Sequence, residues 1–178
     1  MKSGVFATME IDEPARSQVL TVQQWADPRL AGESPPHVTM IGSSGAGPMP
    51  PGTPAARIRE LVEPITAATA PIVVPFERPH RFMQTDIVVL PIDSHGPLRT
   101  LHERIRSSGL PFERPRFPFS PHVTLSFYPR LTPEMERRLM QVRVDDPVRL
   151  DRIKFWLTIE PQPPRLLVEF VLGEGTAN

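Results

Sequence analysis

Two short segments of the chain carry the same residue types, Pro-His-Val-Thr, each followed by an apolar residue. The first motif runs from His37 to Met40 and the second from His122 to Leu125, 85 residues further along. Because strand side chains alternate between two faces, the His and Thr of each motif would share one face and the apolar residues the other. The pattern predicts two half-buried strands whose polar faces line a site.

Two histidines that face one site form an acid–base couple. Imidazole titrates near 6.5, so at neutral pH one ring can accept a proton while the other donates one. In-line displacement at phosphorus needs both events, because the attacking oxygen loses a proton and the leaving oxygen gains one. The hydroxyls of Thr39 and Thr124 would donate to non-bridging phosphate oxygens. A single strand histidine is more often structural, but packing does not require a repeated polar pair, and the repeat favours catalysis by His37 and His122.

The elements that must position these residues follow from periodicity and from turn residues. We expect Asp12 or Glu13 to cap the first helix, Pro64 to end or kink the second, and Gly109 to stop the third. Thr132 should begin the last helix, with acidic residues in its first turn. The expected strands are 5–11, 37–42, 72–76, 86–92, 122–128, 148–159 and 166–172, and the expected helices begin near 13, 54, 97 and 133.

This order predicts an α+β protein with mainly antiparallel sheets and helices on the outside. Each half of the chain offers a helix, a His-x-Thr strand, a second helix and a pair of strands. We therefore expect residues 1–178 to form one domain of two lobes, related by pseudo-twofold symmetry, whose sheets face a central cleft. Each lobe would contribute one motif to that cleft.

Composition limits the classes of function. Lys plus Arg and Asp plus Glu number 20 each, which disfavours a wide nucleic-acid surface but permits a local basic cleft. With no cysteine, thiolate chemistry and Cys-based zinc sites are excluded. The residues after Met1 do not resemble a signal peptide, and no apolar run approaches the roughly 18 residues of a membrane span. We expect a cytoplasmic monomer that makes no membrane contact.

The paired motifs, their separation and the chain length resemble the two-histidine (2H) phosphoesterases, which include 2′-5′ RNA ligase-like proteins and RNA 2′,3′-cyclic phosphodiesterases. The resemblance implies a bilobal fold and hydrolysis of a cyclic phosphate to a 2′-phosphate without a metal or other cofactor. By analogy, His37 would protonate the leaving 3′ oxygen and His122 would activate water. The substrate would be an RNA terminus or a small nucleotide, and 2′-5′ RNA ligase activity is a further implication.

Several residues near the motifs are candidates for substrate binding. Relatives in the ligase branch often place an arginine soon after the second motif, and here the first arginine is Arg130, after Tyr128 and Pro129. Phe82, Tyr128 and Trp156 could stack on a base, although core packing is the default for Trp156. Arg81 belongs to a basic connection before the fourth expected strand and could attract an anionic substrate.

Other motifs give weaker signals. The glycine-rich segment 42–47 lacks the Lys-Ser/Thr of a P-loop, and we expect a flexible loop at the rim of the cleft. His80, His95 and His102 lack metal-ligand spacing and are expected at the surface or in loops. The alternatives left open are a phosphodiesterase acting on 2′-5′ linked oligonucleotides, cyclic dinucleotide-type signals or ADP-ribose cyclic phosphate, and a binding module for nucleotides or RNA ends that has no turnover.

Overall fold

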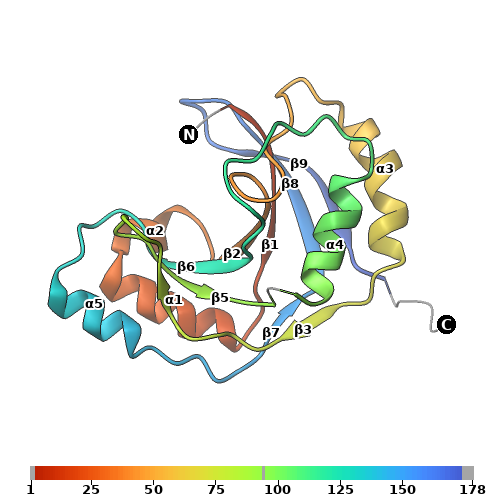
Figure 1. The fold of residues 1–178 in the computed structure, drawn as a ribbon. Coiled ribbons are helices and arrows are strands. Elements are labelled where there is room, and N and C mark those ends of the chain that lie inside the picture. The colour runs from red at the N-terminus through yellow and green to blue at the C-terminus, as the bar shows by residue number, and fades with distance from the viewer. Residues whose placement is uncertain (1–2, 94, 174–178) are drawn as a thin grey trace.

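A computed structural model describes residues 3–93 and 95–173 of the chain (Figure 1). The outermost residues of the expected domain, 1–2 and 174–178, and residue 94 lie outside the described part. The strands are β1 (Gly4–Glu10), β2 (His37–Ile41), β3 (Ile72–Val74), β4 (His80–Arg81), β5 (Val88–Pro91), β6 (His122–Ser126), β7 (Val148–Leu150), β8 (Arg152–Thr158) and β9 (Arg165–Val171). The helices are α1 (Ala15–Ala26), α2 (Pro28–Glu33), α3 (Ala55–Ala67), α4 (Pro97–Arg106) and α5 (Pro133–Met140).

A seven-stranded sheet in the order β4-β5-β6-β2-β1-β8-β9 contains strands from both halves of the chain, and its neighbours pair antiparallel. Strands β3 and β7 pair separately. The α+β architecture expected from the sequence is therefore confirmed. The two motif strands β6 and β2 lie side by side near the middle of the large sheet. Flanking strands repeat outward from them, with β5 beside β6 and β1 beside β2.

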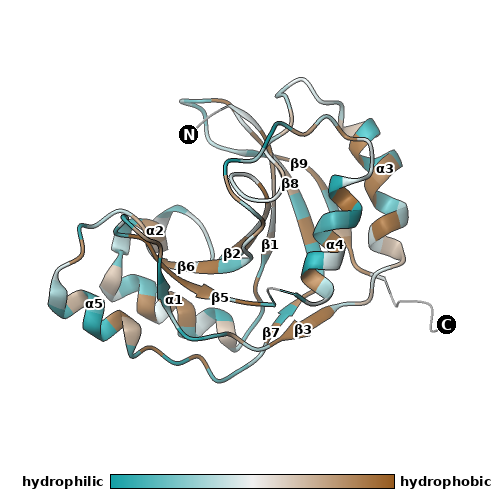
Figure 2. Ribbon diagram, in the orientation of Figure 1, coloured by the Kyte–Doolittle hydropathy of each residue, from teal (hydrophilic) through white to brown (hydrophobic). Residues whose placement is uncertain are grey.

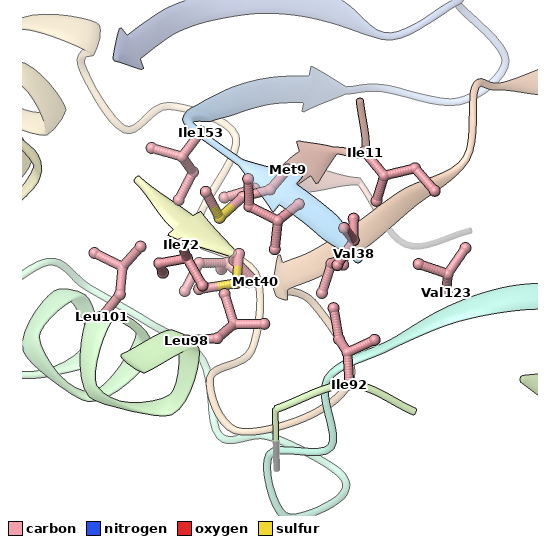
Figure 3. Packing of buried hydrophobic residues seen from close by; sticks show 14 of the residues in the cluster. Met9, Ile11, Val38, Met40, Ile72, Ile92, Leu98, Leu101, Val123 and Ile153 are labelled. Carbon is pink, nitrogen blue, oxygen red and sulfur yellow. The ribbon is translucent and has the colours of Figure 1, made fainter. Parts of the chain in front are cut away.

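Alternation along the strands explains which face of the sheet is covered. In β1, Val5, Ala7 and Met9 are buried while the residues between them are half-buried, and Val38 and Met40 continue the buried face in β2. Figure 3 shows Met40 beside Leu98 of α4, and Met9 and Val38 belong to the same buried cluster. Burying these side chains contributes roughly 1.5–3 kcal/mol each. The motif strands are therefore held by the core on one face and left partly open on the other.

The helices gather into two groups around the sheet. In Figure 1, α1, α2 and α5 lie near β5 and β6, whereas α3 and α4 lie on the other side of the molecule. Figure 2 shows apolar and polar stretches alternating along α3 and α4, as expected of helices with one face on a core. Their inward residues include Ile58, Val62, Leu98 and Leu101, all of which are buried.

The expected start of α5 is confirmed, whereas the expected cap of α1 and an end of α3 at Pro64 are not. Thr132 caps α5 as expected, since its hydroxyl accepts a hydrogen bond from the Met135 amide at 3.2 Å. The cap expected at Asp12 or Glu13 is wrong: Pro14 stands at the N-cap of α1, and the Glu13 carboxylate instead accepts from the Ser17 amide. Of the two outcomes expected at Pro64, an end or a kink, the end is wrong.

Helix α3 continues through Pro64 to Ala67. A proline inside a helix removes one backbone donor and costs about 3 kcal/mol in an unsupported helix. Here burial of Ile58, Val62 and Thr66 on the sheet side outweighs that local cost. Tertiary packing overrides the propensity that made Pro64 look like an end.

The two strands expected after α3, 72–76 and 86–92, have their regular partners elsewhere, since β3 pairs with β7 and β5 pairs with β6. An isolated antiparallel bridge joins Phe76 to Ile92. The segment between them contains the short strand β4, which extends the large sheet from β5. The expected strand 148–159 divides into β7 and β8. The periodicity of a single strand carries no information about which strands it pairs with. Long-range packing determines the pairing.

Candidate functional site

Both motif histidines are oriented by the same local contact. Nδ1 of His37 lies 2.8 Å from the carbonyl oxygen of Pro35, and Nδ1 of His122 lies 2.7 Å from that of Ser120. A carbonyl oxygen only accepts hydrogen bonds, so each Nδ1 carries a proton and donates it. The two rings are thereby fixed alike, and Nε2 of each remains for chemistry.

The sheet brings the two motifs together. Val38 lies opposite Val123 in the antiparallel pairing of β2 with β6. This register sets His37 toward Thr124 and Thr39 toward His122, on the face opposite the buried valines. All four side chains are half-buried, as expected for residues that line a site. We call this side of the sheet, with Thr8, His37, Thr39, His122 and Thr124, the site face.

Electrostatics distinguishes the two histidines. The pKa of His122 is lowered from its usual 6.5, first because burial disfavours the charged ring and to a smaller extent because of the positive charge of His37. The hydrogen bond to Ser120 opposes this shift without cancelling it. His122 is therefore neutral at pH 7, and its Nε2 has a free lone pair. That state suits a proton acceptor.

Phe82 stands next to the second histidine. Its ring meets the His122 ring edge-on, with centroids 5.1 Å apart and planes at 83°. Such an apolar neighbour helps to keep water from the imidazole. Phe82 is itself half-buried, which leaves part of its ring open.

The remaining expected binding residues are placed differently. Arg81 donates to Glu136 at 2.8 Å and to Asp86 at 3.0 Å, so its guanidinium is occupied by carboxylates. The Tyr128 hydroxyl donates to Glu33, and Arg29 lies 3.8 Å above the Tyr128 ring. Arg130 is exposed, two residues beyond Tyr128. The structure thus sets Phe82 against a motif histidine and engages Arg81 and Tyr128 in contacts of their own.

Neighbouring strands add polar groups that sequence reasoning did not assign to the site. Thr8 lies opposite Thr39, and Glu10 opposite His37. The Glu10 carboxylate accepts from Lys154 at 2.6 Å, and Thr8 accepts from the indole nitrogen of Trp156 at 3.0 Å. The alternation in residues 5–11 already indicated that Thr8 and Glu10 share a face, but only the register shows that this is the site face.

Trp156 and two of the other histidines test the remaining expectations. Trp156 is half-buried and bonded to Thr8, so placing it in the core by default is wrong. His80 is exposed, as expected. It lies opposite Val89, which in turn lies opposite Thr124, so the register puts His80 on the site face. The expectation that His102 is at the surface is also wrong.

His102 is buried on α4, with only 1% of its surface exposed. Its ring stacks on Phe119 at a centroid distance of 3.7 Å, and its Nδ1 lies 2.9 Å from the carbonyl oxygen of Met40. The spacing Leu98, Leu101, Ile105 marked the buried side of α4, and His102 follows Leu101 on it. A histidine is by type more often found at the surface, but the position of His102 on the buried side of the helix determines its burial.

The glycine-rich segment is tied to backbone carbonyls. The amides of Gly42, Gly45 and Gly47 donate to the carbonyl oxygens of Ala46, Phe117 and Glu113 at 2.9–3.0 Å. Backbone donors used in this way cannot also cradle a phosphate. Gly45 adopts φ +71°, a left-handed conformation that favours glycine.

Within residues 3–93 and 95–173, no three His, Cys, Asp or Glu side chains gather as a metal site would require. None of the helices in these ranges combines the length and apolar character needed to cross a bilayer.

Comparison with known proteins places the chain in a family. The family model of the 2′-5′ RNA ligase superfamily matches residues 11–160, which include both motifs. The chain belongs to this superfamily, that of the 2H phosphoesterases. The resemblance inferred from the paired motifs is therefore confirmed.

Solved structures agree with the family. The protein TT0787 of Thermus thermophilus is 18% identical with a TM-score of 0.65, over 96% of this chain and 98% of that one. E. coli LigT, solved with phosphate, is 13% identical with a TM-score of 0.59, over 97% and 98% of the two chains. LigT with 3′-AMP gives 13% and 0.60, over 96% and 97%. At these identities the likeness establishes the fold. No curated protein sequence matches the chain.

Proposed function

We propose that the protein is a phosphoesterase that hydrolyses a 2′,3′-cyclic phosphate, on an RNA end or a nucleotide, to a 2′-phosphate. His37 and His122 act as the acid–base pair, and the hydroxyls of Thr39 and Thr124 hold the phosphate. Membership in the 2′-5′ RNA ligase superfamily supports a phosphoesterase. The identity of the substrate as a cyclic phosphate is proposed beyond that membership.

The reaction needs one proton accepted and one donated. Nε2 of neutral His122 takes a proton from water as the water oxygen forms a bond to phosphorus. The bond from phosphorus to the 3′ oxygen breaks, and protonated His37 gives its Nε2 proton to that oxygen. The product carries the phosphate on the 2′ oxygen, and solvent returns both rings to their starting states. The threonine hydroxyls donate to the non-bridging oxygens, where negative charge accumulates.

One observation supports the assignment most directly. Each motif histidine donates its Nδ1 proton to a carbonyl two residues earlier, which leaves both Nε2 atoms for the site face. A structural histidine needs no such duplicate on the neighbouring strand. The lowered pKa of His122 favours it as the base and His37 as the acid.

The proposed substrate class rests on chemistry near His122 and on structural relatives. LigT has been solved with phosphate, 3′-AMP, ATP and NADP+. Phe82, beside His122, would stack on a base, and Tyr128 and Arg130 would contact the nucleotide beyond it. Arg81, held by two carboxylates, would fix the Phe82 segment and act on substrate only indirectly. That residues 1–178 act as one domain, as a cytoplasmic monomer, remains a prediction.

The test is hydrolysis of 2′,3′-cyclic nucleotides by purified protein in the presence of EDTA. Phosphorus NMR identifies whether the product is a 2′- or a 3′-phosphate, and we expect the 2′-phosphate. His37→Ala and His122→Ala should each lower kcat by about 10²–10⁴-fold. His95→Ala is the matched control, since His95 is exposed and outside both motifs.

Two results would overturn the proposal. Cyclic nucleotides that bind without turnover, with affinity unchanged in both alanine variants, would make the protein a binding module. Turnover confined to 2′-5′ linked or cyclic oligonucleotides would retain the acid–base pair and replace the substrate.

A further inference from the structure

Both motif strands are irregular at the same motif position. In β2, Thr39 pairs with Thr8 and Ile41 pairs with Ala7, which makes Met40 an extra residue in that strand. In β6, Thr124 pairs with Val89 and Ser126 with Val88, which makes Leu125 the extra residue. Each is a β-bulge directly after the motif threonine. Bulges bend a strand and re-aim its side chains, and they occur often beside active sites.

A bulge removes regular ladder partners, so its backbone groups need other donors. The Met40 carbonyl oxygen accepts from Nδ1 of His102 at 2.9 Å. The Thr124 carbonyl oxygen, at the peptide bond that leads into the second bulge, accepts from Nε2 of Gln23 at 2.8 Å. His102 and Gln23 are 1% and 2% exposed, so both bonds are shielded from water. Two buried helix side chains thus hold the two bulges.

Each of these two donors comes from one half of the chain and bonds the motif strand of the other half. Gln23 lies on α1, which leads toward β2 in sequence, yet it holds β6. His102 lies on α4, which leads toward β6, yet it holds β2. Each helix therefore fixes the motif strand of the other half.

The rest of each side chain has no comparable contact. Oε1 of Gln23 and Nε2 of His102 are buried and have no hydrogen-bond partner in the described part of the chain. Leaving a buried polar atom unpaired is unfavourable, so each side chain is only half satisfied at its buried position. The hydrogen bond that Gln23 and His102 each make is the one to the backbone of a motif strand.

We infer that Gln23 and His102 are positioning residues that set the two bulges and thereby aim the hydroxyls and imidazoles of both motifs at one phosphate. This inference rests on the proposed function of the site face. Neither residue faces the substrate. Both act through the backbone of the strands that carry His37, Thr39, His122 and Thr124.

Matched substitutions at position 102 separate the hydrogen bond from the packing. His102→Phe keeps a ring against Phe119 but has no donor. His102→Asn loses the ring but places an amide nitrogen close to where Nδ1 lies. We expect kcat to fall about 10- to 100-fold in His102→Phe, as for a small misplacement of reacting groups, with KM nearly unchanged. His102→Asn should recover much of kcat even if it lowers Tm more.

Substitutions on α1 provide the second pair. Gln23→Met keeps the length of the side chain and removes the donor, and Gln24→Met changes an exposed neighbour on the same helix. Gln23→Met should behave as His102→Phe does, and Gln24→Met as wild type. Amide hydrogen exchange of β2 and β6, followed by NMR, should quicken in the two donor-deficient variants and remain unchanged in α3.

The exchange measurement does not depend on turnover. If wild-type protein hydrolyses no cyclic phosphate, the proposed function fails, and exchange in β2 and β6 still decides the positioning role. Wild-type exchange and kcat in His102→Phe and Gln23→Met would overturn the inference. Equal loss of kcat in His102→Asn and His102→Phe would also overturn it, because ring packing would then matter and the donor would not.

Discussion

Val38 lies directly opposite Val123, and this antiparallel pair joins the two motif strands. The valines face the core, so the histidines and threonines on either side of them emerge together on the other face. One buried contact between the halves of the chain therefore assembles four polar side chains.

The pH dependence of kcat/KM should distinguish the two histidines. Below its pKa the His122 ring is protonated and cannot accept a proton, so the acidic limb reports this residue. Because burial lowers the pKa of His122, the limb should lie below 6.5. His37→Asn should lower kcat/KM and leave the acidic limb in place. Pre-steady-state or steady-state rates across pH provide the measurement, and an acidic limb above 6.5 would contradict the assignment.

The motif hydroxyls should matter for rate and little for stability. Thr39→Val and Thr124→Val replace a hydroxyl by a methyl of similar size on a half-buried face. Losing one donor to the phosphate oxygens should lower kcat by about 10²-fold. Thermal unfolding should change little. Thr21→Val, at an exposed position on α1, is the control, and wild-type kcat in both motif variants would refute the hydroxyl role.

Phe82 should help to lower the pKa of His122. Phe82→Ala would open His122 to water, and because burial is the first cause of its lowered pKa, that pKa should rise toward 6.5. The acidic limb of kcat/KM should then move to higher pH. Histidine ring signals in NMR titrations measure the shift directly. Phe82→Leu keeps apolar cover, and it should show a smaller shift than Phe82→Ala.

Stability should fall as the solution becomes acidic, in part through His102. Burial lowers the pKa of His102, and the charges of Arg99 and Arg106 add to this, while Met40 and Glu103 oppose it. In acid, His102 therefore binds a proton more readily in the unfolded chain than in the folded protein.

This contribution is fully present above the unfolded pKa of 6.5 and is lost as pH falls through the lower folded value. Denaturant unfolding between about pH 5 and pH 8 measures it. His102→Asn should make the free energy of unfolding depend less steeply on pH. The pH dependence that remains should include a contribution from His122, whose pKa is also lowered. An unchanged slope in His102→Asn would contradict this prediction.

A glycine after the first motif should be intolerant of substitution. A methyl group on Gly42 would lie 2.8 Å from Cγ2 of Thr39, closer than carbon atoms pack. Gly42→Ala should displace Thr39 and lower kcat. Gly52→Ala is the matched control, because nothing lies within 4 Å of the added methyl there. Equal kcat in the two variants would show that Thr39 has room to move.

Local patterns predicted much of the fold. The motif strands, the start of α5 at Thr132 and the α+β class all followed from periodicity and caps. The continuation of α3 past Pro64, the burial of His102 and the contact of Trp156 with Thr8 all depend on contacts between distant segments. The cap expected at Asp12 or Glu13 was a local error, because Pro14 stands at the N-cap instead. A sequence window contains the propensity of a residue but not the energy of its tertiary neighbours.

The sequence by itself determined the chemistry available to this protein. It carries two histidines and two threonines in repeated strands, and each strand has an apolar side that must be buried. Only the tertiary structure decided that Val38 meets Val123, that Phe82 covers His122, and that Gln23 and His102 hold the bulges. The physical reason is that side-chain alternation is a property of one strand, whereas register, bulges and helix-to-strand hydrogen bonds exist only once distant segments pack.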